Sequence, residues 1–85
     1  MRYFAGVDVG GTNTKIGILD ENADILIQEI IKTESEKGAE NTIERIWQTI
    51  KKISEIIGIK LEEIEGIGVG TVNKLIKNGV EFREE

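Results

Sequence analysis

The residues of this chain best suited to chemistry lie around a glycine turn, between Asp8 and Lys15. Asp8 comes near the end of an apolar run, where an unpaired carboxylate would be costly to bury. A hydrated Mg²⁺ ion would relieve that cost, because Mg²⁺ prefers one or two carboxylates together with water. The backbone N–H groups of Gly10, Gly11 and Thr12 can approach phosphate oxygens closely. These residues therefore predict a site for a phosphate group and Mg²⁺.

Three side chains can complete such a site. Thr12 and Asn13 can donate hydrogen bonds to phosphate oxygens, and Lys15 can place a cation beside their charge. From the residues alone, a tight hairpin capped by an Asp, without a ligand, is an equally open interpretation. No residue is identified as catalytic. The candidate nucleotide-binding residues are Asp8, Gly10, Gly11, Thr12, Asn13 and Lys15, with Asp8 also the candidate metal ligand.

Two apolar runs must position this turn, and they predict the strands of a β-hairpin. The first run covers residues 3–9, and the second covers residues 14–20, with Ile16 and Ile18 on one face. Residues 25–33 are rich in Ile and Leu and predict a third strand. The charged side chains within that run suit a strand at or near the edge of a sheet.

One helix is predicted over residues 41–57. Asn41 can cap its first turn, and Glu44 would complete a pair that resembles a capping box. Gly58 is the expected stop signal. Apolar residues recur at three- and four-residue spacing, which predicts one buried stripe that includes Trp47 as a core residue. The predicted stripe consists of Ile43, Ile46, Trp47, Ile50, Ile53, Ile56 and Ile57.

A fourth strand is predicted over residues 64–71, where Gly66, Gly68 and Gly70 alternate with apolar residues. Glycine at alternate positions indicates close approach by another element, and the helix is the expected neighbour of that face. A strand, a helix and a further strand predict parallel pairing of the first and fourth strands. The predicted sheet order is therefore 3-2-1-4. Residues 74–82 predict a terminal hairpin with an Asn-Gly turn.

The sequence DVGGTNTKIGILD resembles the first phosphate motif of the sugar kinase, Hsp70 and actin superfamily, and most closely that of the ROK family of glucokinases. The resemblance continues through KGAENTIERIWQTIKKI, which is similar to the first helix of that family, and IEGIGVGT, which is similar to its fourth strand. It implies an α/β fold in which residues 1–85 form a single partial actin-like ATPase (ribonuclease H-like) lobe. It also implies ATP and Mg²⁺ as cofactors and a role as a fragment of an ATP-dependent sugar kinase.

The chain departs from the ROK pattern after the fourth strand. Thr71 is followed directly by Val72 and Asn73, where the family has a Pro-Gly-Pro loop that helps to form the sugar pocket. This departure puts hexose binding in question. A full ROK kinase has two lobes and is several times longer, and its catalytic Asp, second phosphate motif and adenosine pocket have no counterpart here. The isolated chain is therefore expected to be inactive, and the alternative function is a homodimeric half-lobe with a structural role. The expected dimer contact is the sheet face that the helix leaves uncovered or the terminal hairpin.

The amino-acid composition argues against several classes of function and kinds of site. The chain has 85 residues and a net charge of −5, which argues against a nucleic-acid surface. It contains no Cys and no His, so disulfides, a structural zinc site and a His general base are not expected. No apolar run is long enough to span a membrane, so a cytoplasmic location is expected. Abundant Glu and Lys fit either a heat-adapted protein or simply an acidic, well-solvated surface.

Overall fold

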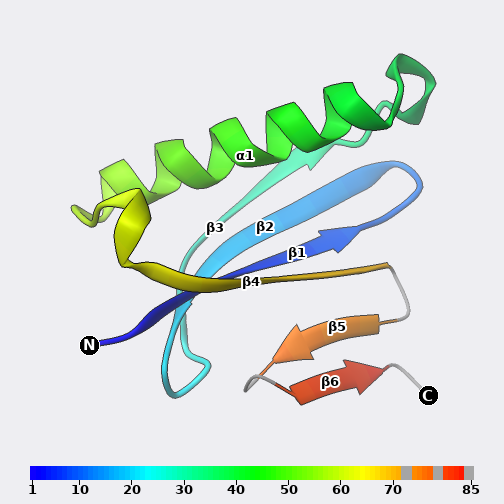
Figure 1. The fold of residues 1–85 in the computed structure, drawn as a ribbon. Coiled ribbons are helices and arrows are strands. Elements are labelled where there is room, and N and C mark those ends of the chain that lie inside the picture. The colour runs from blue at the N-terminus through cyan, green and yellow to red at the C-terminus, as the bar shows by residue number, and fades with distance from the viewer. Residues whose placement is uncertain (72–73, 78–79, 84–85) are drawn as a thin grey trace.

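A computed structural model describes residues 1–71, 74–77 and 80–83 of the chain. Its centre is a four-stranded sheet in the order β3-β2-β1-β4, with the helix α1 across one face (Figure 1). This order, and the α/β class, confirm the predictions from the sequence. The elements of this unit are β1 (Tyr3–Val9), β2 (Asn13–Asp20), β3 (Ile25–Lys32), the 3₁₀ turn η1 (Ser35–Lys37), α1 (Ala39–Ile56), the 3₁₀ turn η2 (Leu61–Glu63) and β4 (Ile64–Thr71).

The predicted strand boundaries are close to the observed ones. β1 and β4 begin and end where the sequence places them, β2 begins one residue earlier, and β3 ends one residue earlier, at Lys32. β1 pairs antiparallel with β2 and parallel with β4, and β2 pairs antiparallel with β3. The β1–β2 turn therefore lies at the same end of the sheet as the end of β4.

The core lies between the sheet and α1. Alternation along β1 and β2 turns every second side chain toward the helix, and the three- and four-residue spacing of α1 turns Ile50 and Ile53 toward the sheet. Ile59, after the helix, closes one end of this core. The buried apolar residues are Ala5, Val7, Ile16, Ile18, Ile50, Ile53 and Ile59.

The start of α1 differs from the prediction. The helix begins at Ala39, after Gly38, whose φ of 95° is a conformation that suits glycine. No side chain of a described residue caps the helix start. Asn41 lies inside the first turn, and its Oδ1 accepts a hydrogen bond of 2.7 Å from Arg45 Nε. The predicted cap at Asn41 is therefore wrong, because Gly38 allows an earlier start and Arg45 occupies the Asn41 side chain.

The end of α1 agrees with the prediction that Gly58 terminates the helix. Gly58 has a φ of 80°, and its N–H donates to the Glu55 carbonyl at 3.1 Å. The N–H of Ile59 donates to the Ser54 carbonyl at 3.0 Å. These two bonds form a Schellman motif, which satisfies carbonyls that the helix leaves without partners.

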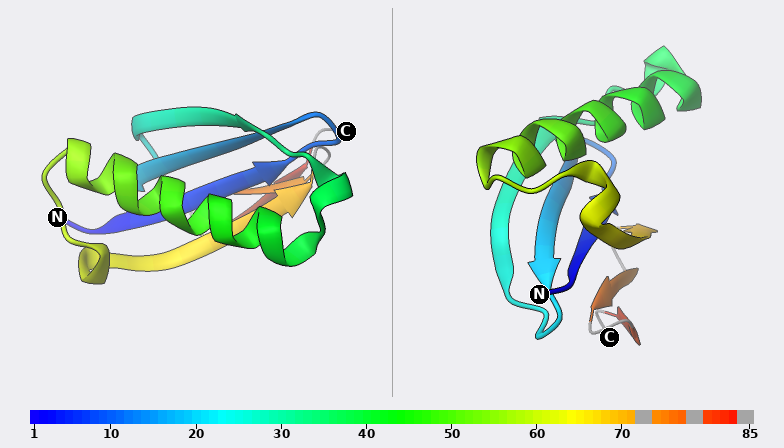
Figure 2. Two further views of the ribbon diagram at one scale, coloured as in Figure 1. Left: turned by 90° about the horizontal axis from the view of Figure 1, so that it is seen from above. Right: turned by 60° about the vertical axis from the view of Figure 1, so that its left-hand side comes forward.

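The contacts of the helix are mainly with β2 and β3, and Figure 2 shows from above that the helix crosses the sheet obliquely. A helix is roughly 10 Å wide and strands are about 4.8 Å apart, so one helix covers about two strands. The apolar stripe is therefore only partly buried, and Trp47 is 44% and Ile43 64% exposed. The prediction that Trp47 and the whole stripe lie in the core is wrong for these residues and for Ile56.

The glycines of β4 lie on the face of the sheet opposite α1. Ala5 and Val7 point toward the helix, and they pair with Ile67 and Val69, so Gly66, Gly68 and Gly70 take the other face. The expectation that the helix packs against these glycines is therefore wrong. On their own face, Gly68 continues a row of glycines with Gly6 and Gly17 across β4, β1 and β2.

The predicted terminal hairpin is present as β5 (Lys74–Lys77) and β6 (Val80–Arg83), which pair antiparallel in a separate two-stranded sheet. Its predicted Asn78-Gly79 turn lies outside the described residues. β5 lies near β4 and β1, on the side of the main sheet away from α1 (Figures 1 and 2). In the described part of the chain, no helix is both long and apolar enough to cross a membrane.

Candidate functional site

The β1–β2 turn is closed by one backbone hydrogen bond. The N–H of Gly10 donates to the carbonyl of Asn13 at 2.9 Å. A Cβ atom at Gly10 would lie 2.8 Å from that same carbonyl oxygen, so a side chain cannot be accommodated without a shift. Gly10 therefore shapes the turn, and the prediction that its N–H is free to bind phosphate is wrong.

The next two residues carry the available donors. Gly11 and Thr12 are exposed, and within the described residues their backbone N–H groups have no hydrogen-bond partner. A Cβ atom at Gly11 would meet no atom of the described residues within 4 Å, so the space beside this donor is open. Two adjacent N–H groups at an open turn can donate hydrogen bonds to an anion.

Asp8 lies beside this turn on the sheet face opposite α1. It pairs with Lys15 on β2 and with Gly70 on β4, and Gly70 contributes no side chain over that position. The Oδ1 atom of Asp8 is buried and has no hydrogen-bond partner in the part of the chain that the structure describes. A buried carboxylate oxygen without a partner is costly, so this position favours an additional ligand.

The three remaining predicted site residues are exposed at the same end of the sheet as the turn. Thr12 and Asn13 lie in and just after the turn, and Lys15 follows on β2 opposite Asp8. Lys15 forms no ion pair with any described residue. The structure thus brings all the predicted residues together at one end of the β1–β2 hairpin.

Two buried threonines, Thr14 and Thr33, lie behind the turn and are not predicted from the sequence as part of the site. Thr33, which follows β3, donates its N–H to the Thr12 carbonyl at 2.9 Å and its hydroxyl to the Gly10 carbonyl at 2.8 Å. The hydroxyls of Thr14 and Thr33 are 2.7 Å apart. No local pattern marks these residues, since both read as ordinary β-branched residues of a strand.

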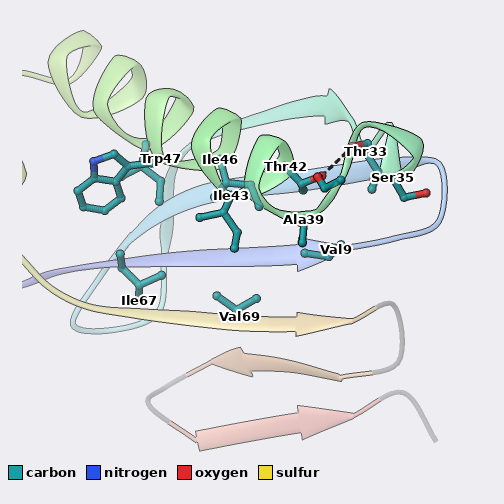
Figure 3. Close-up of a pocket in the computed structure, with 12 residues that line it drawn as sticks. Val9, Thr33, Ser35, Ala39, Thr42, Ile43, Ile46, Trp47, Ile67 and Val69 are labelled. Atoms are coloured by element: carbon teal, nitrogen blue, oxygen red, sulfur yellow. Dashed lines mark hydrogen bonds between the residues drawn. The ribbon is translucent and has the colours of Figure 1, made fainter.

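A second feature is an apolar groove of about 700 Å³ between α1 and β4 (Figure 3). Its apolar walls are formed by residues that a single helix leaves uncovered. They offer no charged group for a phosphate. The main apolar residues of this helix–β4 groove are Val9, Ile43, Ile46, Trp47, Ile67 and Val69.

The turn, and not the helix–β4 groove, carries the polar groups that a phosphate and a metal ion would need. Among the described residues, Gly11 and Thr12 supply two donors without partners, and Asp8 supplies a carboxylate oxygen without one. No group of three metal-ligating side chains occurs among the described residues. A hard cation held by one carboxylate would take its other ligands from phosphate oxygens and water, as Mg²⁺ does.

The sheet order and the glycine turn define a class of protein, that of actin-like ATPase and sugar kinase lobes. A ROK hexokinase from Thermus thermophilus matches with a TM-score of 0.68 and 28% identity over 81% of this chain and 22% of that chain. A ROK glucokinase from Streptomyces griseus, in complex with glucose and AMPPNP, matches with a TM-score of 0.66 and 30% identity. That match covers 84% of this chain and 20% of the glucokinase.

The same fold also occurs outside the sugar kinases. The activator of 2-hydroxyisocaproyl-CoA dehydratase from Clostridium difficile, with bound ADPNP, matches with a TM-score of 0.54 and 28% identity. The match covers 81% of this chain and 24% of the activator. The fold by itself is therefore not specific to sugar kinases.

The family is more specific. The sequence model for the N-terminal domain of the FGGY family of carbohydrate kinases matches residues 3–76, and the chain belongs to this family. Glucokinase from Thermotoga maritima is 34% identical over 76 residues, which is 88% of this chain. The chain spans about 22% of the length of that glucokinase. The predicted resemblance to ROK sugar kinases is confirmed by these relatives.

Proposed function

We propose that residues 1–85 act as one partial nucleotide-phosphate-binding lobe of an ATP-dependent sugar kinase, and that the β1–β2 turn binds the phosphates of ATP. The observation that carries this proposal concerns three polar groups that have no partner in the described part of the chain: the N–H groups of Gly11 and Thr12 and the Oδ1 atom of Asp8. Nucleotides bound to two of the similar structures support it.

Each residue of the turn has a distinct role in this proposal. The N–H groups of Gly11 and Thr12 donate to phosphate oxygens, and Gly10 fixes the shape of the turn by its bond to Asn13. The side chains of Thr12 and Asn13 add hydrogen bonds. Lys15, which has no ion pair in the described residues, places a positive charge beside the phosphates.

Asp8 is the proposed partner of Mg²⁺. When bound, ATP supplies the phosphoryl group and Mg²⁺ neutralises the charge on its phosphate oxygens. The Oδ1 atom of Asp8 accepts a hydrogen bond from a water of the hydrated ion or binds the ion itself. Either contact would satisfy an oxygen that has no partner in the described residues.

A titration with Mg-ATP, followed by amide chemical shifts, tests this proposal. We expect millimolar Mg-ATP to shift the Gly11 and Thr12 signals most, because these N–H groups gain a charged acceptor. Asp8→Asn should weaken the response to Mg-ATP but leave the response to ATP without Mg²⁺ nearly intact.

With glucose added, we expect no ADP formation above background, because phosphoryl transfer also needs groups that no residue here supplies. Absence of shifts at the turn would refute phosphate binding, and glucose-dependent turnover that Asp8→Asn abolishes would refute the proposed inactivity.

Self-association is the second candidate property, and one specific observation favours it. Four large apolar side chains of the helix–β4 groove, Ile43, Trp47, Ile67 and Val69, are exposed. The sequence pointed to the second sheet face or the terminal hairpin as the contact of a homodimer, whereas these side chains favour the groove. Burying them in a second copy would be favourable at about 25 cal/mol per Å² of apolar surface, before the cost of association.

Sedimentation equilibrium tests this candidate. We expect twice the chain mass at micromolar concentration, and Trp47→Ser should shift the species to the monomer. Ile30→Ser is the matched control, because Ile30 is 54% exposed but lies on β3, away from the groove. A monomer at all concentrations would refute self-association. A dimer that is insensitive to Trp47→Ser would place the contact elsewhere.

The proposal also covers the cellular location and the source of the chain. We propose a cytoplasmic location, since the proposed nucleotide is ATP. We also propose a heat-adapted source, which the abundance of Glu and Lys and the relatives in Thermotoga maritima and Thermus thermophilus support.

A further inference from the structure

Thr33 reaches both sides of the tip of the proposed phosphate turn. Its N–H donates to the Thr12 carbonyl at 2.9 Å, and its hydroxyl donates to the Gly10 carbonyl at 2.8 Å. The two accepting carbonyls lie on either side of Gly11, the open tip of the turn. Thr33 itself is only 4% exposed, so neither bond faces strong competition from solvent.

The direction of the hydroxyl bonds follows from proton counting. A hydroxyl has one proton to donate, and that of Thr33 goes to the Gly10 carbonyl. The contact of 2.7 Å between the two threonine hydroxyls must then be donated by Thr14 to Thr33. The chain of hydrogen bonds therefore runs from Thr14 through Thr33 to the Gly10 carbonyl, and it begins at a fully buried residue, Thr14.

Thr33 is in turn fixed to α1. Arg45 donates through Nη1 to the Lys32 carbonyl at 2.6 Å and through Nη2 to the Thr33 carbonyl. The Thr42 hydroxyl also approaches the Thr33 carbonyl, at 3.4 Å (Figure 3). The position of Thr33 is therefore set by the helix as well as by the sheet.

We propose that Thr33 is a positioning residue that aims the Gly11 N–H at the phosphate; this rests on the function proposed above. The Gly10 carbonyl and the Gly11 N–H belong to the same peptide unit, which is planar and trans, so they point in opposite directions. When the Thr33 hydroxyl holds the carbonyl inward, the Gly11 N–H is turned away from Thr33. The donor is thus oriented before any ligand arrives, which lowers the ordering cost of binding.

Two substitutions at one position separate the hydroxyl from the rest of the side chain. Thr33→Val removes the hydroxyl and keeps the shape, whereas Thr33→Ser keeps the hydroxyl. Thr49→Val is the matched control, because Thr49 is a buried threonine whose hydroxyl donates to the Arg45 carbonyl at 2.8 Å, away from the turn. Thr33→Ala serves as a second variant without the hydroxyl, in case the Val side chain clashes with the Gly10 carbonyl.

Two readouts are measured at a temperature where each variant is folded. The first readout is the state of the turn without nucleotide, measured by the chemical shift of the Gly11 amide and the hydrogen-exchange rate of the Gly10 amide. The second is affinity for Mg-ATP. We expect Thr33→Val to move the Gly11 signal, to speed Gly10 exchange and to weaken Mg-ATP binding about 3- to 10-fold, the worth of one hydrogen bond. Thr33→Ser should stay within about 2-fold of the parent, and Thr49→Val should leave both readouts unchanged.

The outcomes distinguish this inference from the function on which it rests. If the parent chain does not bind Mg-ATP, the proposed function fails, and the amide readout alone still tests whether Thr33 orients the turn. If the parent binds, and both hydroxyl-free variants bind equally well with an unchanged Gly11 signal, the positioning role is refuted. An equal loss of affinity in Thr49→Val would also refute it, because the effect would then be one of general stability.

Discussion

Replacing Ile53 by Ala is expected to lower the free energy of unfolding by about 2–5 kcal/mol. Ile53 is fully buried on α1, in the core that the helix forms with β1 and β2. Truncation removes buried methyl groups and leaves a cavity that the flanking strands can close only in part. Since small domains are stable by only about 5–15 kcal/mol, the loss would leave a marginal fold.

Urea denaturation, followed by circular dichroism, measures this effect. Ile56→Ala is the matched control, with the same chemical change one turn further along α1 at a residue that is 65% exposed. We expect the control to change the free energy of unfolding by less than about 0.5 kcal/mol. Equal losses in the two variants would contradict the orientation of α1, or would mean that Ile56 is buried by another molecule in solution.

The second large effect is expected at the turn, where neighbouring glycines have different roles. Gly10→Ala should destabilise the protein by about 1–3 kcal/mol, because the new Cβ would press on backbone that cannot easily move. The atom it meets is the Asn13 carbonyl oxygen, 2.8 Å away, which also accepts the hydrogen bond that closes the turn. Mg-ATP binding should be lost with the turn geometry.

Gly11→Ala is the informative partner of that variant. A Cβ atom there meets nothing within 4 Å, so we expect thermal unfolding close to that of the parent chain. The methyl group would nevertheless occupy the open space beside the proposed donors, and Mg-ATP affinity should fall. Thermal unfolding and the Mg-ATP titration together check both variants. Full Mg-ATP affinity in Gly11→Ala would argue against phosphate binding at this turn, and an unchanged melting temperature in Gly10→Ala would contradict the turn geometry.

Much of the fold follows from the sequence, because its signals are local. The apolar runs at residues 3–9 and 14–20, with glycines between them, are sufficient to specify the first hairpin. The spacing of Ile50 and Ile53 specifies a helix with one buried face, and Gly58 specifies its end. The succession of these elements then leaves few ways to connect them, and the order 3-2-1-4 follows.

The site was predictable only as a set of residues. The motif identifies Asp8 and the turn, since their chemistry depends on residue type and close spacing. It does not reveal that the Gly10 N–H is already used within the turn, or that the Asp8 Oδ1 is buried without a partner in the described residues. These facts depend on the closure of the turn and on the pairing of β1 with β4.

The tertiary structure decided the features that involve distant segments. Trp47 has the spacing of a core residue, but one helix covers about two strands, so the side chain is left at an uncovered edge. The β4 glycines lie away from α1 because the parallel register turns Ile67 and Val69 toward it. Thr33 lies 23 residues after Gly10, and it reaches the turn only because β3 ends beside the turn. Sequence patterns report which residues share a face, whereas packing and register determine what that face meets.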